Sequence, residues 1–284
     1  TEVSRPLKDI IDEVNYLVEN GTKEIILLGQ NVNAYFYENE KGDIINFGLL
    51  LFYLSRNKGI KRIRYTTSHP NNFDEQTYLA YEKLPQLVSH LHLPIQSGSD
   101  KVLAAMKRGY TVLEYKSVIR KLKKARPDIT FSSDFIVGFP GETEDDFLKT
   151  IDLIKDIEFD QSYSFIYSKR PGTPAASLED NTPYSVKKER LKFLQETINS
   201  LSKNRSKSII GEKAEVLVEG VSSKFENMVT GRTTNNKIVN IPGHNKLVGE
   251  LLNIQITDFN NKSLKGEILT CLLYTSPSPR DSSQ

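Results

Sequence analysis

The sequence predicts an α/β protein, in which a partial (β/α) barrel precedes a small antiparallel β-barrel. Three observations support this prediction. Helical and strand-like patterns alternate through the first two-thirds of the chain, only strand-like patterns follow Gly211, and a polar cluster follows each of the five strands of the first part. Because helices that alternate with strands make right-handed crossovers, this order favours a parallel sheet.

Apolar residues at helical spacing predict the first helix over 6–19. Pro6 suits its first turn, and Asn20 with Gly21 ends it. A short apolar run then predicts a buried strand over 23–28. The same rhythm predicts helices over 47–57, 73–84, 100–108, 111–126 and 144–157, and strands over 62–66, 89–93, 130–137 and 161–167. Because no strand precedes the first helix, we expect the chain to be truncated at its front end.

A long polar helix over 184–207 is predicted to close the first domain. It carries seven Lys and Arg against two Glu, a net charge of +5, and is the most basic stretch of the chain. Short, turn-bounded strands follow over 214–218, 228–231, 238–241, 251–257 and 266–269, a pattern typical of a small antiparallel barrel. We therefore expect domains at 1–206 and 207–270, and a disordered, non-native tail at 271–284.

The composition excludes several classes of protein. The chain has 38 Lys and Arg against 36 Asp and Glu, and its 38% of hydrophobic residues excludes a disordered tail protein. It has no apolar run that could span a membrane and no signal peptide, so we expect a soluble, cytoplasmic protein. Because the net charge is only +2, contact with nucleic acid depends on local basic patches.

The five polar clusters lie at 29–33, 67–70, 94–99, 138–143 and 168–174. In a (β/α) barrel such loops meet at the carboxyl ends of the strands, where active sites lie. The sequence therefore predicts an active-site rim. No cluster has the pattern of a dinucleotide fingerprint or a phosphate-binding loop, which argues against nicotinamide-dependent and kinase-like enzymes.

Some rim residues have a functional and a structural interpretation. The three amides at Gln30, Asn31 and Asn33 suit the polar edge of a small-molecule cofactor. Gly98, among small polar residues, allows backbone N–H groups to approach a ligand. The neighbouring serines have a second interpretation, because serine also caps helices and a helix starts near Asp100.

The remaining polar residues of the rim have mainly structural interpretations. Thr143 and Asp146 predict a capping box at the start of a helix. His69 is either a general base or a structural residue of its loop. His90 and His92 are interpreted as ordinary residues of their strand.

The rim motifs together resemble one enzyme family. They are Gly29-Gln30-Asn31-Val32-Asn33, Thr67-Ser68-His69-Pro70, Pro94-Ile95-Gln96-Ser97-Gly98-Ser99, Gly138-Phe139-Pro140-Gly141-Glu142-Thr143 and Arg170-Pro171-Gly172-Thr173-Pro174. The set resembles the radical-SAM methylthiotransferases, and within them the MiaB type, over about residues 1–269. The strand-only domain resembles a TRAM domain, a small RNA-binding barrel, most recognisably at Gly231-Arg232-Thr233.

The resemblance implies methylthiolation of isopentenyladenosine beside the tRNA anticodon by radical chemistry, a transferase activity in tRNA processing. It implies S-adenosylmethionine and two 4Fe-4S clusters in the full-length parent, with tRNA, sulfur donors and electron donors as partners. The implied cofactor residues are Gln30, Asn31, Asn33, Gln96, Ser97, Ser99, Asp134, Gly138 and Glu142. The implied substrate or RNA residues are His69, Arg170, Thr173, Lys203, Arg205, Lys207, Arg232 and Lys237.

The chain departs from the family in its cysteines. The family ligates its catalytic cluster through a Cys-x-x-x-Cys-x-x-Cys segment, which would lie before Thr1, upstream of the remnant Glu2-Val3-Ser4-Arg5. The only cysteine here is Cys271, in a tail that resembles translated sequencing-adaptor read-through. Because cluster ligation requires thiolates, we expect that this chain ligates no cluster and is inactive alone.

Two alternatives remain open at this point. In the first, the parent is a methylthiotransferase for another target, either threonylcarbamoyl-adenosine tRNA or a ribosomal protein. Otherwise the chain is a non-catalytic RNA-binding module. The coding sequence upstream of Thr1 distinguishes the enzyme from the module, because only the enzyme requires the three cysteines.

Overall fold

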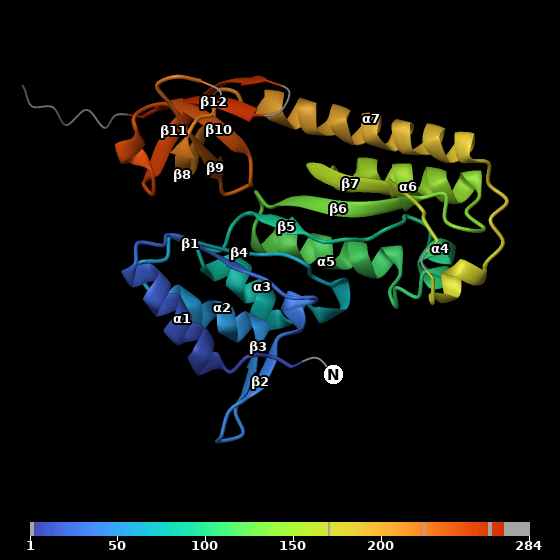
Figure 1. Cartoon of the computed structure of the whole chain (residues 1–284), viewed down its shortest axis with the longest axis horizontal. Helices are drawn as coiled ribbons and strands as arrows, with labels where there is room; N and C mark the ends of the chain where they lie inside the picture. Colours follow the sequence, from blue (N-terminus) through green and yellow to red (C-terminus); the bar gives the residue numbers. More distant parts are fainter. Residues whose placement is uncertain (1–2, 170, 224, 261–262, 270–284) are drawn as a thin grey trace, which may run out of the picture.

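The structure is a computed structural model that describes residues 3–169, 171–223, 225–260 and 263–269, so Cys271 and the predicted tail lie outside it. Five parallel strands follow one another in sequence order: β1 (Glu24–Leu27), β4 (Arg62–Tyr65), β5 (His90–His92), β6 (Thr130–Val137) and β7 (Gln161–Ile166). A parallel bridge between Ile63 and Leu87 joins the β1–β4 pair to the β5–β6–β7 sheet. The predicted partial (β/α) barrel is confirmed (Figure 1).

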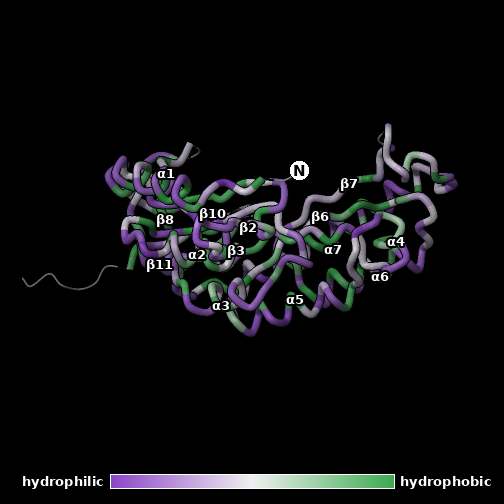
Figure 2. Tube along the Cα trace, turned by 90° about the horizontal axis from the view of Figure 1, so that it is seen from below, coloured by the Kyte–Doolittle hydropathy of each residue, from purple (hydrophilic) through white to green (hydrophobic). Residues whose placement is uncertain are grey.

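Helices connect these strands and cover one side of them. They are α1 (Leu7–Glu19), α2 (Phe47–Ser55), α3 (Glu75–Lys83), α4 (Asp100–Ala105), α5 (Val112–Ala125), α6 (Glu144–Ile157) and α7 (Tyr184–Ser208). Figure 2 shows α5 and α6 on one side of β6 and β7, with polar and apolar residues alternating along them. The predicted helices are confirmed, and no helix among the described residues is long and apolar enough to cross a membrane.

The main core lies between the strands and these helices, and it includes Ile63, Leu91 and Phe135. Side chains alternate along a strand, so the residues before and after each of these core positions face the opposite side of the sheet, away from the helices. Most of those residues are polar: Arg62 and Arg64 on β4, His90 and His92 on β5, and Ser132 and Asp134 on β6, where Ile136 is the apolar exception. A closed (β/α) barrel fills its interior with branched apolar side chains, whereas this partial barrel has a polar one.

One element of the first domain was not predicted. Strands β2 (Phe36–Glu38) and β3 (Ile44–Asn46) form a two-stranded hairpin after β1. Its turn is held by the Asn39 side chain, which accepts hydrogen bonds from the backbone N–H groups of Lys41 and Asp43 at 2.9 and 2.8 Å. These strands follow β1 without an intervening α-helix, so they do not fit the strand–helix alternation from which the other strands were predicted.

The second domain is a closed five-stranded barrel of β8 (Lys213–Val221), β9 (Met228–Thr233), β10 (Ile238–Pro242), β11 (Leu251–Asn260) and β12 (Ser263–Ile268). Its core contains Val216, Val239, Ile254 and other buried aliphatic residues. Neighbouring strands are antiparallel except β10 and β12, which are parallel. A closed ring with an odd number of strands cannot alternate in direction throughout, so one parallel pair is required.

The small barrel docks on the amino ends of the parallel strands, opposite the predicted rim. The buried Arg62 guanidinium donates to the carbonyls of Arg232 and, at 3.0 Å, Glu215. The Asn235 amide donates to the carbonyls of Ser89 and Asp128 at 2.9 and 2.7 Å. These contacts satisfy backbone groups of both domains, so the barrel has a fixed position relative to the sheet.

Candidate functional site

Hydrogen bonds join the first two rim loops. Asn33 is buried, and its amide makes a reciprocal pair with the backbone of His69, donating at 2.9 Å and accepting at 2.8 Å. The Asn31 amide donates to the Asn72 side chain at 2.9 Å, while its oxygen is buried and has no hydrogen-bond partner among the residues that the structure describes. Sequence reasoning assigned both amides to the cofactor, but Asn33 instead connects the two loops. Gln30 is exposed beside them.

His69 occupies a structural position in the second loop. Its ring packs edge-on against Tyr110, with 5.2 Å between ring centroids, and its Nδ1 accepts a hydrogen bond from the Asn71 backbone at 3.3 Å. Burial, and then the nearby Arg108 guanidinium, lowers the pKa of His69. Both effects favour a neutral imidazole, which agrees with the structural interpretation of this residue.

In the third loop, Gln96 lines a pocket at the rim, whereas Ser97 and Ser99 are buried. Gln96 has a φ of 79°, and its backbone pairs with β6, donating to Asp134 and accepting from Ile136 at 2.9 Å each. The Ser99 hydroxyl donates to Asp146 of α6 at 2.7 Å and also caps α4. The Ser97 hydroxyl lies 3.4 Å from that of Thr150, also on α6. Both serines are buried against α6, away from the pocket that Gln96 lines, which favours the capping interpretation for Ser99.

A pocket of about 680 Å³ lies at the carboxyl ends of the strands. Its walls come from β6 and β7 and from the segments that follow β5, β6 and β7, and they include Gln96, Asp134, Ile136, Phe139, Tyr167 and Thr173. Three of the predicted site residues, Gln96, Asp134 and Thr173, therefore meet in one cavity. Its volume lies in the range of small-molecule sites. Arg170, which was also predicted, lies outside the described residues.

His92 supports the carboxylate of this pocket, a role that sequence reasoning missed. Its Nε2 lies 3.4 Å from Asp134 Oδ1, and its Nδ1 lies 2.9 Å from the Ser132 hydroxyl. His90, below it on β5, is more deeply enclosed, and burial followed by the nearby Arg64 lowers its pKa to about 3. The alternation of His92 with buried Leu91 and Leu93 indicated that its side chain faces away from the core. Its partners could not be predicted from this pattern, because the parallel register with β6 places them beside it.

The fourth loop is shaped by Glu142. This buried carboxylate accepts hydrogen bonds from the backbone N–H of Gly138 at 2.8 Å and from Arg190 of α7 at 2.9 Å. Burial raises the pKa of Glu142 despite these two contacts. Gly138 has a φ of 68°, and a Cβ there would lie 2.5 Å from Lys187, so the turn requires glycine. Both predicted residues thus hold the loop that places Phe139 in the pocket wall.

The predicted capping box after this loop is confirmed. The Thr143 side chain accepts from the Asp146 backbone, and the Asp146 carboxylate accepts from the Thr143 backbone. Burial alone would raise the pKa of Asp146, but hydrogen bonds from Ser99, Thr143 and Lys101 lower it below its ordinary value. Asp146 therefore joins the third and fourth loops at the start of α6.

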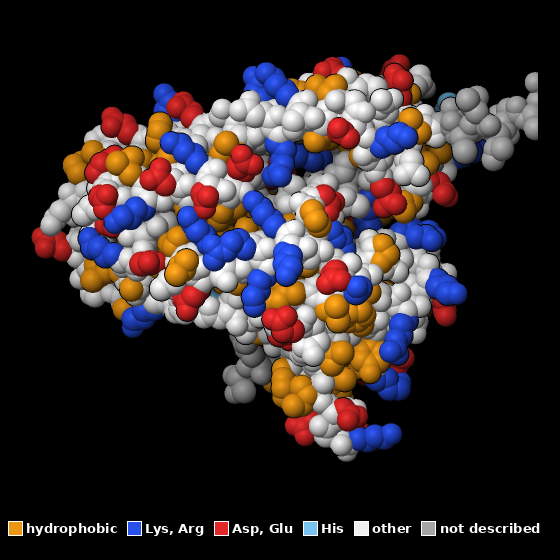
Figure 3. All heavy atoms as spheres, turned by 180° about the vertical axis from the view of Figure 1, so that it is seen from behind, with side chains coloured by type: hydrophobic (Ala, Val, Ile, Leu, Met, Phe, Trp, Pro, Cys, Tyr) orange, Lys and Arg blue, Asp and Glu red, His pale blue; other side chains and the backbone are white. Residues whose placement is uncertain are grey.

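The predicted RNA residues have different surroundings. Lys203 and Lys207 are exposed on α7, but Arg205 reaches back to the carbonyl of Glu158 at 3.4 Å. Lys237 forms an ion pair of 2.7 Å with buried Asp160 between the domains, and Arg232 pairs with Glu219 at 3.1 Å. On the face shown in Figure 3, Lys and Arg are interspersed with Asp and Glu.

Helix α7, the most basic stretch of the sequence, also has fewer solvent-exposed cations than its net charge suggests. Lys187 and Arg190 are buried and form ion pairs with Asp180 and Glu142, respectively. These two cations are neutralised inside the protein, so they cannot contribute phosphate contacts. The net charge of the segment therefore overstates the cations that α7 presents to a ligand.

Comparison with known proteins agrees with this geometry. Residues 1–154 match the Radical SAM superfamily, and residues 207–269 match the TRAM domain. The chain belongs to the radical SAM superfamily. It is 53% identical, over 94% of its own length and 61% of the relative, to the tRNA-2-methylthio-N(6)-dimethylallyladenosine synthase of Francisella philomiragia subsp. philomiragia. The enzyme of the same name from Francisella tularensis subsp. novicida is 52% identical over the same shares.

These relatives confirm the resemblance to the MiaB-type methylthiotransferases. The chain spans about three-fifths of the length of the curated relatives it matches. Among solved structures, the radical S-adenosylmethionine methyltransferase TsrM from Kitasatospora setae is 18% identical, with a TM-score of 0.48 over 61% of this chain and 33% of that one.

Proposed function

We propose that this chain is the cofactor-binding and RNA-binding part of an enzyme that methylthiolates isopentenyladenosine in tRNA. The observation that carries the proposal is that a radical SAM domain with a pocket at its rim is joined, in a fixed arrangement, to a TRAM barrel. The similarity to enzymes named for this reaction extends over both domains. The proposal places the protein in the cytoplasm, with tRNA as its partner.

The chemistry of the pocket fits S-adenosylmethionine. The Asp134 carboxylate suits its positively charged groups and hydroxyls, and the Gln96 amide both donates and accepts. Lys107 and Arg108, which also line the pocket, suit its carboxylate, and Phe139 with Tyr167 offers aromatic surface to a purine. Reductive cleavage of S-adenosylmethionine at a 4Fe-4S cluster supplies radical chemistry in this superfamily. The residues of this chain bind and orient the cofactor and exclude water from it.

The proposal assigns no cluster ligand to the described residues, among which no three His, Cys, Asp or Glu side chains gather as a metal site. Two clusters, their ligands, and the sulfur and electron donors belong to the proposal for the whole protein. For the described residues, the proposed contribution is the pocket and the RNA-binding surface.

The proposed reaction is tested on tRNA from cells with and without the gene. We expect the nucleoside hydrolysate of the deletion strain to lose 2-methylthio-isopentenyladenosine and to accumulate isopentenyladenosine. A plasmid copy of the gene restores the product and is the matched control. If the methylthio group is lost instead from threonylcarbamoyl-adenosine or from a ribosomal protein, the target proposed here is wrong.

The two neighbouring residues of the third loop are predicted to respond differently to truncation. Gln96→Ala removes a polar group from the pocket wall, and we expect about fivefold weaker S-adenosylmethionine binding by calorimetry. Ser97→Ala removes a hydroxyl that faces α6, and we expect about 1 kcal/mol less stability in urea with unchanged affinity. An equal loss of affinity in both variants would place Ser97 at the cofactor.

A further inference from the structure

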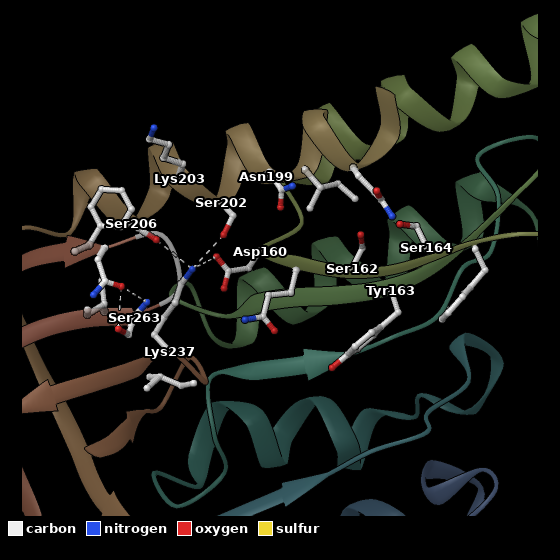
Figure 4. Close-up of a pocket in the computed structure, with 18 residues that line it drawn as sticks. Asp160, Ser162, Tyr163, Ser164, Asn199, Ser202, Lys203, Ser206, Lys237 and Ser263 are labelled. Atoms are coloured by element: carbon white, nitrogen blue, oxygen red, sulfur yellow. Dashed lines mark hydrogen bonds and ion pairs between the residues drawn. The ribbon is translucent and has the colours of Figure 1, made fainter. Parts of the chain in front are cut away.

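A second, larger cavity lies along β7, between the two domains. It has a volume of about 920 Å³, and its walls come from β7, α7 and the β10, β11 and β12 region of the small barrel. In Figure 4, Asn199, Ser202 and Ser206 face it from α7, Ser162 and Ser164 from β7, and Ser263 from the barrel. We call this cavity the β7 groove. None of the motifs of the sequence points to it.

The lining of the β7 groove is rich in neutral hydrogen-bonding groups. Half of its 18 residues are serines or side-chain amides, and its charged residues are Asp160, Lys203 and Lys237. Lys237 forms an ion pair of 2.7 Å with Asp160 and also donates to the Ser202 and Ser206 hydroxyls at 3.5 and 3.4 Å, so these two serines already have a partner. Lys203 has no carboxylate within ion-pair distance among the described residues. Hydroxyls and amides that donate and accept, beside an unpaired lysine, suit the ribose hydroxyls and phosphates of RNA. They do not suit a lipid or a basic peptide.

Two aromatic side chains stand on the exposed face of β7. Tyr163 and Phe165 are 60% and 56% exposed, although large aromatic side chains usually lie in the core. They are two residues apart on one strand, so they project on the same side, about 7 Å from each other. The Tyr163 ring packs edge-on against His92 with 6.0 Å between centroids, which fixes its orientation. Exposed, oriented rings of this kind provide stacking surfaces for unpaired bases.

The β7 groove adjoins the candidate cofactor pocket. Phe165 lines both cavities, and the Asp134 carboxylate of the pocket contacts His92, against which Tyr163 packs. A strand of RNA in the groove would therefore extend from the small barrel to the pocket without leaving the protein surface. The other edge of β7 pairs with β6, so the groove follows a strand edge on which the described residues form no ladder.

We propose that the β7 groove binds single-stranded RNA next to the nucleotide that enters the cofactor pocket, with bases stacked on Tyr163 and Phe165 and the backbone along the edge of β7 opposite β6, on the side of Lys203. The proposal rests on the proposed function. It goes further by stating which part of the RNA substrate the groove binds, namely the unpaired nucleotides next to the one that is modified. It also assigns the RNA contact of Lys203 to a specific surface.

The proposal is tested with the full chain and two probes, a fluorescein-labelled oligouridine and a fluorescein-labelled anticodon stem-loop, by fluorescence anisotropy. Tyr163→Ala is expected to weaken binding of both probes about tenfold, since a stacked base contributes on that scale. Tyr163→Phe keeps the ring and is expected to bind like the wild type. Tyr16→Ala on α1 removes an equally exposed tyrosine (65%) and is the matched control.

A second pair of variants tests the backbone contact. Lys203→Gln is expected to weaken binding and to flatten its salt dependence by about 0.7 in log–log slope. Lys192→Gln, on the same helix but outside the groove, is expected to leave the slope unchanged. Crosslinking with 4-thiouridine in the stem-loop is expected to label the peptide that contains Tyr163 and Phe165.

Wild-type affinity in Tyr163→Ala, crosslinks confined to other surfaces, or no RNA binding by the wild-type chain at low salt would overturn the proposal. The proposed function fails separately, through the tRNA hydrolysates, which do not depend on these variants. The deletion strain could lose the methylthio product while Tyr163→Ala binds RNA like the wild type. That result would support the proposed reaction and contradict RNA binding in the β7 groove. Thermal melting checks that each variant is folded.

Discussion

Arg190→Met is expected to destabilise the protein by about 3–5 kcal/mol at neutral pH, because it leaves a buried carboxylate without its cation. The Glu142 side chain is 1% exposed and the Arg190 side chain 8% exposed, and their atoms lie 2.9 Å apart. The same carboxylate holds the Gly138 backbone, so we also expect weaker S-adenosylmethionine binding. Urea denaturation and calorimetry measure the two effects.

The pH dependence of this variant provides a second test. Burial already raises the pKa of Glu142, and loss of Arg190 removes a contact that lowers it. A carboxyl group whose pKa is raised on folding binds more protons in the folded state, so stability falls as pH rises through its ordinary range and above. We therefore expect a smaller deficit at pH 5 than at pH 7. A deficit that is the same at both pH values would contradict an unpaired Glu142.

The double variant Arg190→Met with Glu142→Gln is the matched control for charge. It removes both charges, and we expect it to recover part of the stability lost in Arg190→Met, since the neutral amide costs less to bury. If the double variant is less stable than Arg190→Met, the loss arises from packing of the Arg190 side chain rather than from the carboxylate.

Gly98→Ala is expected to cost about 3 kcal/mol of stability, through a clash with backbone. A Cβ at Gly98 would lie 2.5 Å from the Lys149 carbonyl oxygen and from the Thr150 Cα of α6, neither of which can rotate away. The clash pushes the third loop away from α6, so Gln96 moves and cofactor affinity falls as well. Urea denaturation and calorimetry with S-adenosylmethionine measure both changes.

Gly220→Ala is the control for this substitution. Nothing lies within 4 Å of a Cβ at Gly220, and we expect a change within about 0.5 kcal/mol. If Gly98→Ala is as mild as this control, the third loop is not held against α6 as closely as the structure indicates.

The sequence by itself determined the rim, the family and the order of the elements apart from the β2–β3 hairpin. Strand and helix patterns depend on local periodicity, so the alternation from the first helix to β7 was predictable, as was the strand-only barrel after Gly211. The clusters after the strands were predictable as a rim because parallel strands end at the same edge. The resemblance to the family then implied Gln96, Asp134 and Thr173 as site residues, and they line one pocket.

Tertiary structure alone decided what each polar residue contacts. The amide of Asn33 and the serines at 97 and 99 have the same local signature as Gln96, but only the packing of loops against each other and against α6 buries them. Arg190 and Lys237 likewise look like surface cations in the sequence, and each meets a carboxylate more than forty residues away. Such contacts depend on strand register and domain docking, which are set by long-range packing and leave no periodic signal in the chain.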